Sequence, residues 1–148
     1  VKLNDASVED RNANANATSG VTGVDLTGKD IAPDGGPANV GRVVYFDFDS
    51  YVVKADAQGL IDGNARFLKA DANRKVVVEG HTDERGGREY NLALGQKRAE
   101  AVRRSLNLLG VQDSQVEAVS FGKEKPAAEG ANEAAYSQNR RAELSYRR

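Results

Sequence analysis

The residues best suited to chemistry lie in one stretch of the chain, between His81 and Arg98. Asp83 follows a short apolar run that predicts a buried strand, and Arg98 lies on the long amphipathic segment that comes next. A carboxylate at a strand end can accept hydrogen bonds from a cation, and the planar fork of an arginine suits a carboxylate. One acid and one arginine at a distance indicate a zwitterionic ligand, such as an amino-acid group. A plain structural ion pair between Asp83 and Arg98 is the alternative interpretation.

His81 allows a second interpretation, in which it acts with Asp83 as the general acid or base of a small hydrolase or amidase. It is the only histidine in the chain, and no nucleophile lies at a usable spacing. The glycines Gly86 and Gly87 could cradle a phosphate before a helix, but they match no phosphate-binding fingerprint. We therefore favour a structural histidine, and these residues predict no metal site and no cofactor.

Composition excludes several other classes of protein. The chain has 148 residues and a net charge of −1, so nothing in its overall charge favours nucleic acid as a partner. It has no cysteine, which excludes disulfide scaffolds and thiolate metal sites, and a single histidine excludes a histidine-rich metal site. No apolar run approaches the length of a membrane-spanning helix.

The first 39 residues differ from the rest of the chain. They are rich in Ala, Asn and Gly, they contain no aromatic residue, and three basic and six acidic residues give them a net charge of −3. Such a segment buries too little apolar surface to offset its chain entropy. We predict a disordered tether over residues 1–39 and one folded domain over residues 40–148. A strand that uses Val21, Val24 and Leu26 is the alternative for the first segment.

Hydrophobic periodicity predicts an α+β domain of the order β-α-β-α-β-(short α)-β. A helical connection between the first two strands favours parallel directions for them. We expect one mixed four-stranded sheet with the two long helices packed on one face. The predicted strands are 43–46, 75–79, 116–121 and 141–146, and the predicted helices are 55–69, 89–109 and 133–139.

The helix predicted at 89–109 has two distinct faces besides its solvent side. At 100° per residue, one apolar stripe about 100° wide forms the core face. Gly95 lies in this stripe where alanine would suit a helix better, so we expect a close backbone approach there. A separate flank borders the loop that starts at Asp83. The core stripe comprises Leu92, Gly95, Ala99, Val102, Leu106 and Leu109, and the flank comprises Asn91, Leu94 and Arg98.

Several separate motifs carry a family resemblance. The stretch VEGHTDERG at 78–86, with EYN at 89–91, LG at 94–95 and RA at 98–99, strongly resembles the OmpA-like peptidoglycan-binding domain family. Within that family, the chain is similar to the peptidoglycan-associated lipoproteins of the Tol–Pal system. YFDFDSY at 45–51, GKEKP at 122–126 and NRRA at 139–142 support the resemblance, which covers residues 42–148.

The resemblance implies a non-catalytic cell-wall anchor that holds the meso-diaminopimelate of peptidoglycan stem peptides. By its motifs, Asp83 and Arg98 clamp the ligand. It also implies TolB, and TolA less directly, as partners, and a place on the periplasmic face of the Gram-negative outer membrane, with roles in envelope integrity and cell division. The lipid-bearing cysteine of such proteins would precede Val1. The further site residues that the resemblance implies are Phe46, Asp47, Phe48, Thr82, Asn91 and Leu94.

Two rival functions remain open from the sequence. One is the hydrolase or amidase that uses Asp83 and His81, and turnover of purified muropeptides would reveal it. The other is a purely protein-docking module whose cleft serves a partner such as TolB, and titration with soluble muropeptide would separate it from a cell-wall binder.

Overall fold

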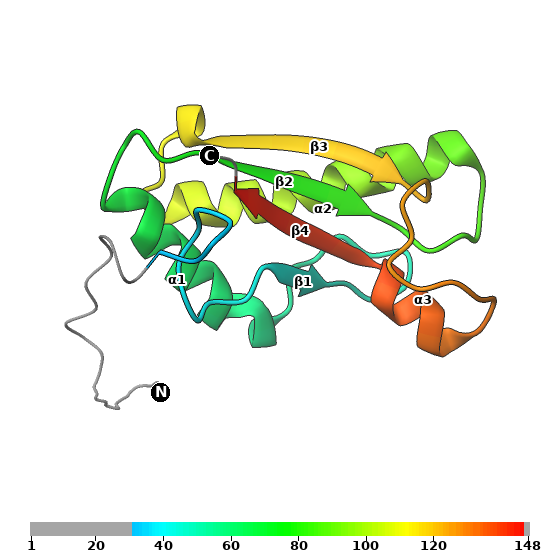
Figure 1. Cartoon of the computed structure of the whole chain (residues 1–148). Helices are drawn as coiled ribbons and strands as arrows, with labels where there is room; N and C mark the ends of the chain where they lie inside the picture. The colour runs from blue at the N-terminus through cyan, green and yellow to red at the C-terminus, as the bar shows by residue number, and fades with distance from the viewer. Residues whose placement is uncertain (1–30, 147–148) are drawn as a thin grey trace. The chain divides into compact units, whose positions relative to one another are not determined.

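The computed structural model describes residues 31–146 of the chain (Figure 1). The compact unit that carries the site begins at Ala32. Within this unit, four strands form one mixed sheet in the order β1-β4-β2-β3. Strand β4 pairs antiparallel with both β1 and β2, and β2 pairs parallel with β3. The strands are β1 (Val43–Tyr45), β2 (Val76–His81), β3 (Val116–Gly122) and β4 (Arg141–Tyr146).

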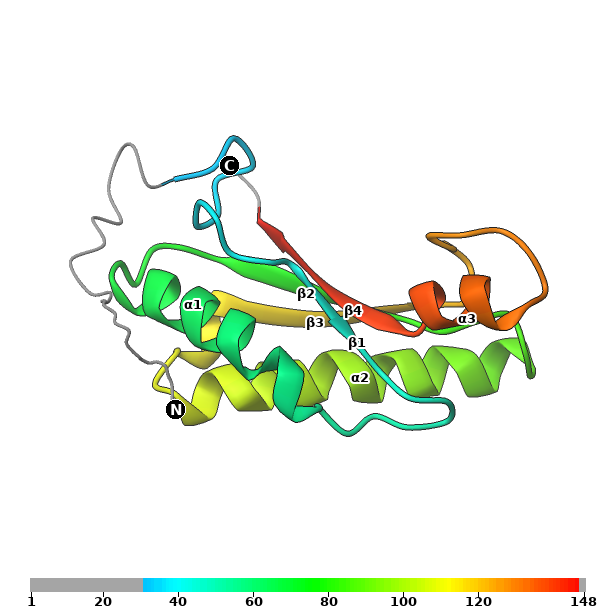
Figure 2. The same cartoon turned by 90° about the horizontal axis from the view of Figure 1, so that it is seen from below.

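Two long helices, α1 (Gln58–Lys69) and α2 (Arg88–Leu108), lie along one face of the sheet (Figure 2). The short helix α3 (Glu133–Asn139) lies at the end of the sheet where β4 begins (Figure 1). Short 3₁₀ turns precede α1 at Ala55–Ala57 and β3 at Asp113–Gln115. The predicted α+β sheet with two long helices on one face is therefore confirmed.

The core fills the space between the sheet and these helices. Alternate strand residues point to opposite faces, so one set from each strand faces α1 and α2. Val78 of β2, Leu106 of α2 and Ile61 of α1 are fully buried. The stability of the domain comes mainly from removing such side chains from water. The opposite face of the sheet carries the other set, including Glu79.

Two glycines allow α2 to approach the sheet closely. A Cβ atom on Gly80 would lie 1.7 Å from the carbonyl oxygen of Gly95. A Cβ atom on Gly95 would lie 2.3 Å from Ser120 Oγ and 3.0 Å from the carbonyl oxygen of Gly80. The close backbone approach expected at Gly95 is therefore present, and it fixes α2 beside the end of β2.

Most element ends lie within one residue of the prediction, and two larger differences stand out. Strand β2 continues to His81 rather than ending at Glu79, because its pairing with β3 and β4 extends past Gly80. The residues just before the predicted start at Val40 also belong to the folded unit. Their turn is held by Asp34, which accepts hydrogen bonds from the Gly36 amide at 2.9 Å and from Arg42 at 2.9 and 3.0 Å. Most of the predicted tether, residues 1–30, lies outside the described residues.

Candidate functional site

A pocket of about 230 Å³ lies where β2 gives way to the loop before α2. The loop, the start of α2 and the segment after β1 supply its walls, so residues far apart in sequence meet there. Its polar lining combines two carboxylates, Asp49 and Asp83, with two guanidinium groups, Arg85 and Arg98. The remaining lining residues are Phe48, Thr82, Gly86, Tyr90, Asn91 and Leu94.

Asp83 is the buried anion of this pocket. Its Oδ1 accepts hydrogen bonds from the Arg85 amide at 3.0 Å and from Arg85 Nε at 3.2 Å, and its Oδ2 lies 2.7 Å from Arg85 Nη2. Arg140 Nη1 lies 3.6 Å from the same Oδ2. Burial acts to raise the pKa of the Asp83 carboxyl, but the hydrogen bonds from Arg85 outweigh it and hold the pKa below its usual value. Asp83 is therefore a fixed carboxylate that cations already surround.

Arg85 is held in place by aromatic rings as well as by charge. Its guanidinium carbon lies 4.2 Å from the ring centroid of Phe48 and 4.2 Å from that of Tyr136. Contacts of this kind stabilise a cation over a π face. More than a third of the Arg85 side chain remains exposed, so it can leave Asp83 without disturbing the core.

Arg98 is buried and ties three parts of the structure together. Its Nε donates to the Ser50 carbonyl at 2.8 Å, its Nη1 to the His81 carbonyl at 2.9 Å, and its Nη2 to the Asp47 carbonyl at 3.1 Å. Burial lowers its pKa to about 10, so it is still charged at neutral pH. Arg98 thus links α2 to the end of β2 and to the loop after β1.

The structure brings most of the predicted site residues together. Phe46 and Asp47 do not line the pocket. Phe46 is buried beneath it, and its carbonyl accepts a hydrogen bond from Arg140 Nε at 3.0 Å. Asp47 contributes its carbonyl to Arg98, whereas its carboxylate is exposed and lies 3.2 Å from Lys54 Nζ. The six predicted residues that do line the pocket are Phe48, Thr82, Asp83, Asn91, Leu94 and Arg98.

Comparison with known proteins identifies the family of this chain. Residues 45–140 match the OmpA family. The chain belongs to the OmpA family. A peptidoglycan-associated lipoprotein from Pasteurella multocida is 56% identical over 105 residues, which are 71% of this chain and 70% of that protein. A second relative of the same name, from Pseudomonas putida, is 54% identical over 100 residues, or 68% of this chain and 60% of that protein.

Solved structures agree with this OmpA-family assignment. The crystal structure of the peptidoglycan-associated lipoprotein from Burkholderia pseudomallei is 61% identical, with a TM-score of 0.71, over 72% of this chain and 90% of that one. The names of these relatives describe an association and not a reaction, and the prediction of a non-catalytic protein is confirmed by them. Among the described helices, none has the length and apolar character needed to cross a membrane.

The sequence interpretation missed the central role of Arg85 in this OmpA-family site. Arg85 is only two residues from Asp83, so its proximity was a usable signal. Asp49 and Tyr90 were also missed. Their side chains are hydrogen-bonded to each other, which holds the loop after β1 against the start of α2.

His81 has no catalytic role in this geometry. Its ring is buried and stacks on Phe121, with the ring centroids 5.5 Å apart. Burial, helped by Arg141, lowers its pKa to about 4, so the ring is neutral at pH 7. The expectation of a satisfied structural histidine is wrong in one respect, because neither ring nitrogen has a hydrogen-bond partner within residues 31–146.

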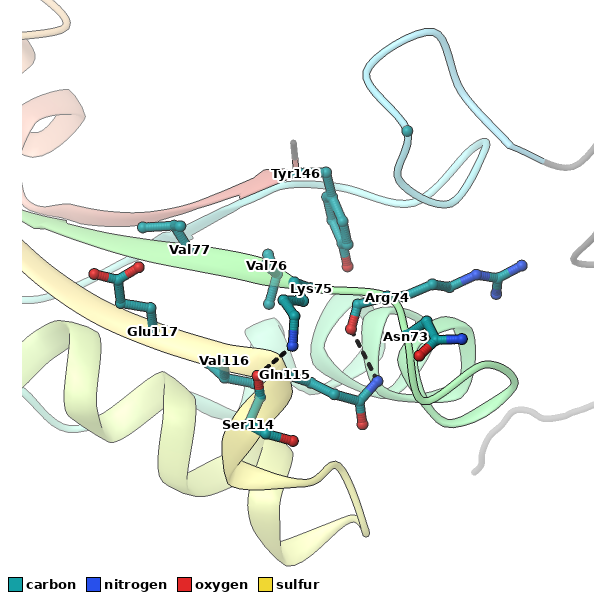
Figure 3. A pocket seen from close by; sticks show the side chains of 11 residues that line it. Asn73, Arg74, Lys75, Val76, Val77, Ser114, Gln115, Val116, Glu117 and Tyr146 are labelled. Atoms are coloured by element: carbon teal, nitrogen blue, oxygen red, sulfur yellow. Dashed lines mark hydrogen bonds between the residues drawn. The ribbon is translucent and has the colours of Figure 1, made fainter. Parts of the chain in front are cut away.

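A second, larger pocket of about 520 Å³ lies at the other end of the sheet, where β2 and β3 begin (Figure 3). None of the predicted site residues lines it. Its main polar side chains make hydrogen bonds that hold the fold. Gln115 Nε2 donates to the Arg74 carbonyl at 3.1 Å, and Lys75 Nζ donates to the Ser114 carbonyl at 3.0 Å (Figure 3). Gln115 Nε2 also donates to the Leu68 carbonyl at 2.7 Å. We therefore place the functional site at the smaller pocket.

Proposed function

We propose that this domain binds the meso-diaminopimelate of peptidoglycan stem peptides in the pocket at Asp83, without catalysis. The observation that carries the proposal is a buried carboxylate in a pocket whose two acids and two arginines balance in charge. Such a pocket suits a ligand that is itself a zwitterion, because each charge finds an opposite partner. The names of the relatives, which contain the word peptidoglycan, support peptidoglycan as the polymer that this domain binds.

The side-chain end of diaminopimelate carries an ammonium and a carboxylate on one carbon. Asp83 receives the ammonium. In the ligand-free protein Arg85 occupies both Asp83 oxygens, so the incoming ammonium takes the place of Arg85 at one of them. Because the Arg85 side chain is partly exposed, displacing it from Asp83 costs little free energy. The guanidinium can turn toward solvent and still contact the aromatic ring of Phe48.

Arg98 receives the ligand carboxylate. A guanidinium has five N–H donors, and three of those of Arg98 bind backbone carbonyls. Two of its donors therefore remain for a ligand, and Arg98 is one of the residues that line the pocket. Asn91 is held in position by its bond from Nδ2 to the Arg85 carbonyl at 2.9 Å, and Leu94 supplies an apolar wall. The exposed rings of Phe48 and Tyr90 form a rim against which a peptide can pack.

In the cell, this binding anchors the outer membrane to the cell wall from its periplasmic face. The attachment to the membrane is through an N-terminal lipid anchor, and the protein works within the Tol–Pal system with TolB and TolA. These elements of the proposal rest on the resemblance to peptidoglycan-associated lipoproteins.

Co-sedimentation with purified sacculi tests the proposal. The parent is expected to pellet with diaminopimelate-type sacculi, and Asp83→Asn is expected to stay in the supernatant. Glu84→Gln is the matched control, because it removes the neighbouring exposed carboxylate and is expected to pellet like the parent. Pelleting of Asp83→Asn at the parental level would contradict the site. Release of Asp83-dependent soluble fragments from the sacculi would instead support the hydrolase.

A further inference from the structure

The open face of the sheet, away from α1 and α2, carries an unexplained cluster of three side chains. They are Glu79 and His81 of β2 and Glu143 of β4, and one ligand atom from each lies within 4.8 Å of the others. The register explains why they meet, since Glu79 and Glu143 are direct cross-strand partners and His81 lies two residues along the same face. None of them belongs to the lining of the Asp83 pocket.

Two features of this cluster are costly unless something else binds there. Like charges directly opposite each other across a sheet are destabilising, and Glu79 faces Glu143 in this way, a cost that the ion pair of Arg141 with Glu143 offsets only in part. His81 is 1% exposed, and neither of its ring nitrogens has a hydrogen-bond partner within residues 31–146. A buried polar atom without a partner normally costs free energy, so such an atom calls for an explanation.

We propose that Glu79, His81 and Glu143 form a binding site for a divalent transition-metal ion such as Zn²⁺. Imidazole with carboxylate oxygen is a ligand set suited to zinc, whereas calcium and magnesium prefer oxygen alone. The spacing is close to what is needed, because His81 Nε2 lies 3.6 Å from Glu79 Oε1. Ligand atoms around a tetrahedral zinc are about 3.4 Å apart, given bonds of roughly 2.0–2.2 Å. The three ligand atoms now lie within 4.8 Å of one another, and rotation of the two glutamate side chains would bring them to this spacing.

Two cations border the cluster. Arg141 Nε lies 2.5 Å from Glu143 Oε2, so it orients that carboxylate through one of its two oxygens. Lys125 Nζ lies 3.9 Å from the ring centroid of Phe121, which in turn stacks on His81. The charges of Arg141 and Lys125 oppose a cation at His81, so binding needs the carboxylates of both Glu79 and Glu143. The ion would join β2 to β4 directly. It would act on the stability of the sheet without contacting the peptide pocket.

The single histidine of the chain makes a direct test possible. In tag-free protein, the only histidine ring resonances belong to His81, so Zn²⁺ titration followed by NMR reports on this residue alone. We expect those resonances to shift until one Zn²⁺ ion is bound per protein molecule. The melting temperature should rise by a few degrees at saturating Zn²⁺. Addition of EDTA should reverse both changes, and Ca²⁺ should cause neither.

Substitutions then identify the other ligands. Glu79→Gln and Glu143→Gln should each weaken Zn²⁺ binding by about 100-fold or more, because loss of even an outer partner of a metal ligand costs 10–100-fold. Glu117→Gln is the matched control, an exposed glutamate on the same face of β3, and should bind like the parent. No histidine shift up to millimolar Zn²⁺ would overturn the proposal, as would binding that both substitutions leave unchanged. Binding to sacculi is a separate readout, so failure here leaves the peptidoglycan proposal intact.

Discussion

Replacement of Arg98 by alanine is expected to destabilise the domain strongly as well as to weaken binding. Its three hydrogen bonds hold two carbonyls of the loop after β1 and one of strand β2, and the one to His81 is buried. A buried carbonyl left without a partner costs about 1–3 kcal/mol, and each of the two partly exposed bonds is worth about 0.5–1.5 kcal/mol. We therefore expect Arg98→Ala to lower the free energy of unfolding by about 4 kcal/mol, the middle of a range of about 2–6 kcal/mol.

Urea denaturation followed by circular dichroism measures this loss. With a slope of about 1.5–2 kcal/mol per molar urea, the unfolding midpoint should fall by about 2 M. Arg98→Lys should recover only part of the difference, because one ammonium cannot reproduce a planar fork directed at three carbonyls. Arg104→Ala, an exposed arginine on the same helix, is the control and should change stability by less than about 0.5 kcal/mol.

The result that would refute this reasoning is an Arg98→Ala midpoint equal to that of the parent. Arg98 would then contribute nothing as a tie between α2, β2 and the loop after β1, and its buried position would have no structural explanation. Because the variant is expected to be less stable, its peptide binding must be measured at a temperature and urea concentration where it is fully folded.

Two further predictions concern glycine packing and the titration of His81. Gly95→Ala should lower the free energy of unfolding by about 1–3 kcal/mol in urea, because its Cβ would lie 2.3 Å from Ser120 Oγ. Gly59→Ala in α1 is the control: its Cβ would have nothing within 4 Å, so it should raise the free energy of unfolding by about 0.4–1 kcal/mol. Equal effects at both positions would show that α2 does not approach the sheet closely. The pKa of His81 is about 4 in the folded protein and 6.5 in the unfolded chain, so on acidification the unfolded chain binds a proton first. In metal-free buffer, the free energy of unfolding should therefore fall by about 3 kcal/mol between pH 6.5 and 4. Urea midpoints across this range should therefore fall less in His81→Asn than in the parent, and parallel curves would contradict the buried neutral ring.

The elements of the fold were predictable because their signals are local. The period of apolar residues located α1 and α2, and Gly110, with a φ of 104°, ends the second helix region as expected. The flank of Asn91, Leu94 and Arg98 was also predictable from helical geometry alone. The position of β4 was predictable only in part: the last strand had to lie beside the first or the second strand, but its pairing with both leaves no mark in the local sequence.

The details of the site depended on contacts that no local pattern encodes. Arg98 binds backbone carbonyls, which every residue possesses, so its partners at Asp47 and Ser50 carry no sequence signature. Arg85 is held beside Asp83 by the rings of Phe48 and Tyr136, which lie far apart in the sequence. The cluster at Glu79 likewise depends on the register of β4, and a single histidine was too weak a signal for a metal site on its own.

We propose that Asp83 and Arg98 bind the two opposite charges at the end of diaminopimelate. Calorimetric titration of the parent with two otherwise identical stem peptides, one containing diaminopimelate and one containing lysine, tests it most directly. Lysine lacks the terminal carboxylate, which leaves Arg98 without its partner. Loss of such a pair costs roughly 2–5 kcal/mol, so the lysine peptide should bind about 30-fold more weakly or worse. Equal affinity for the two peptides would contradict the claim, even if both bind tightly.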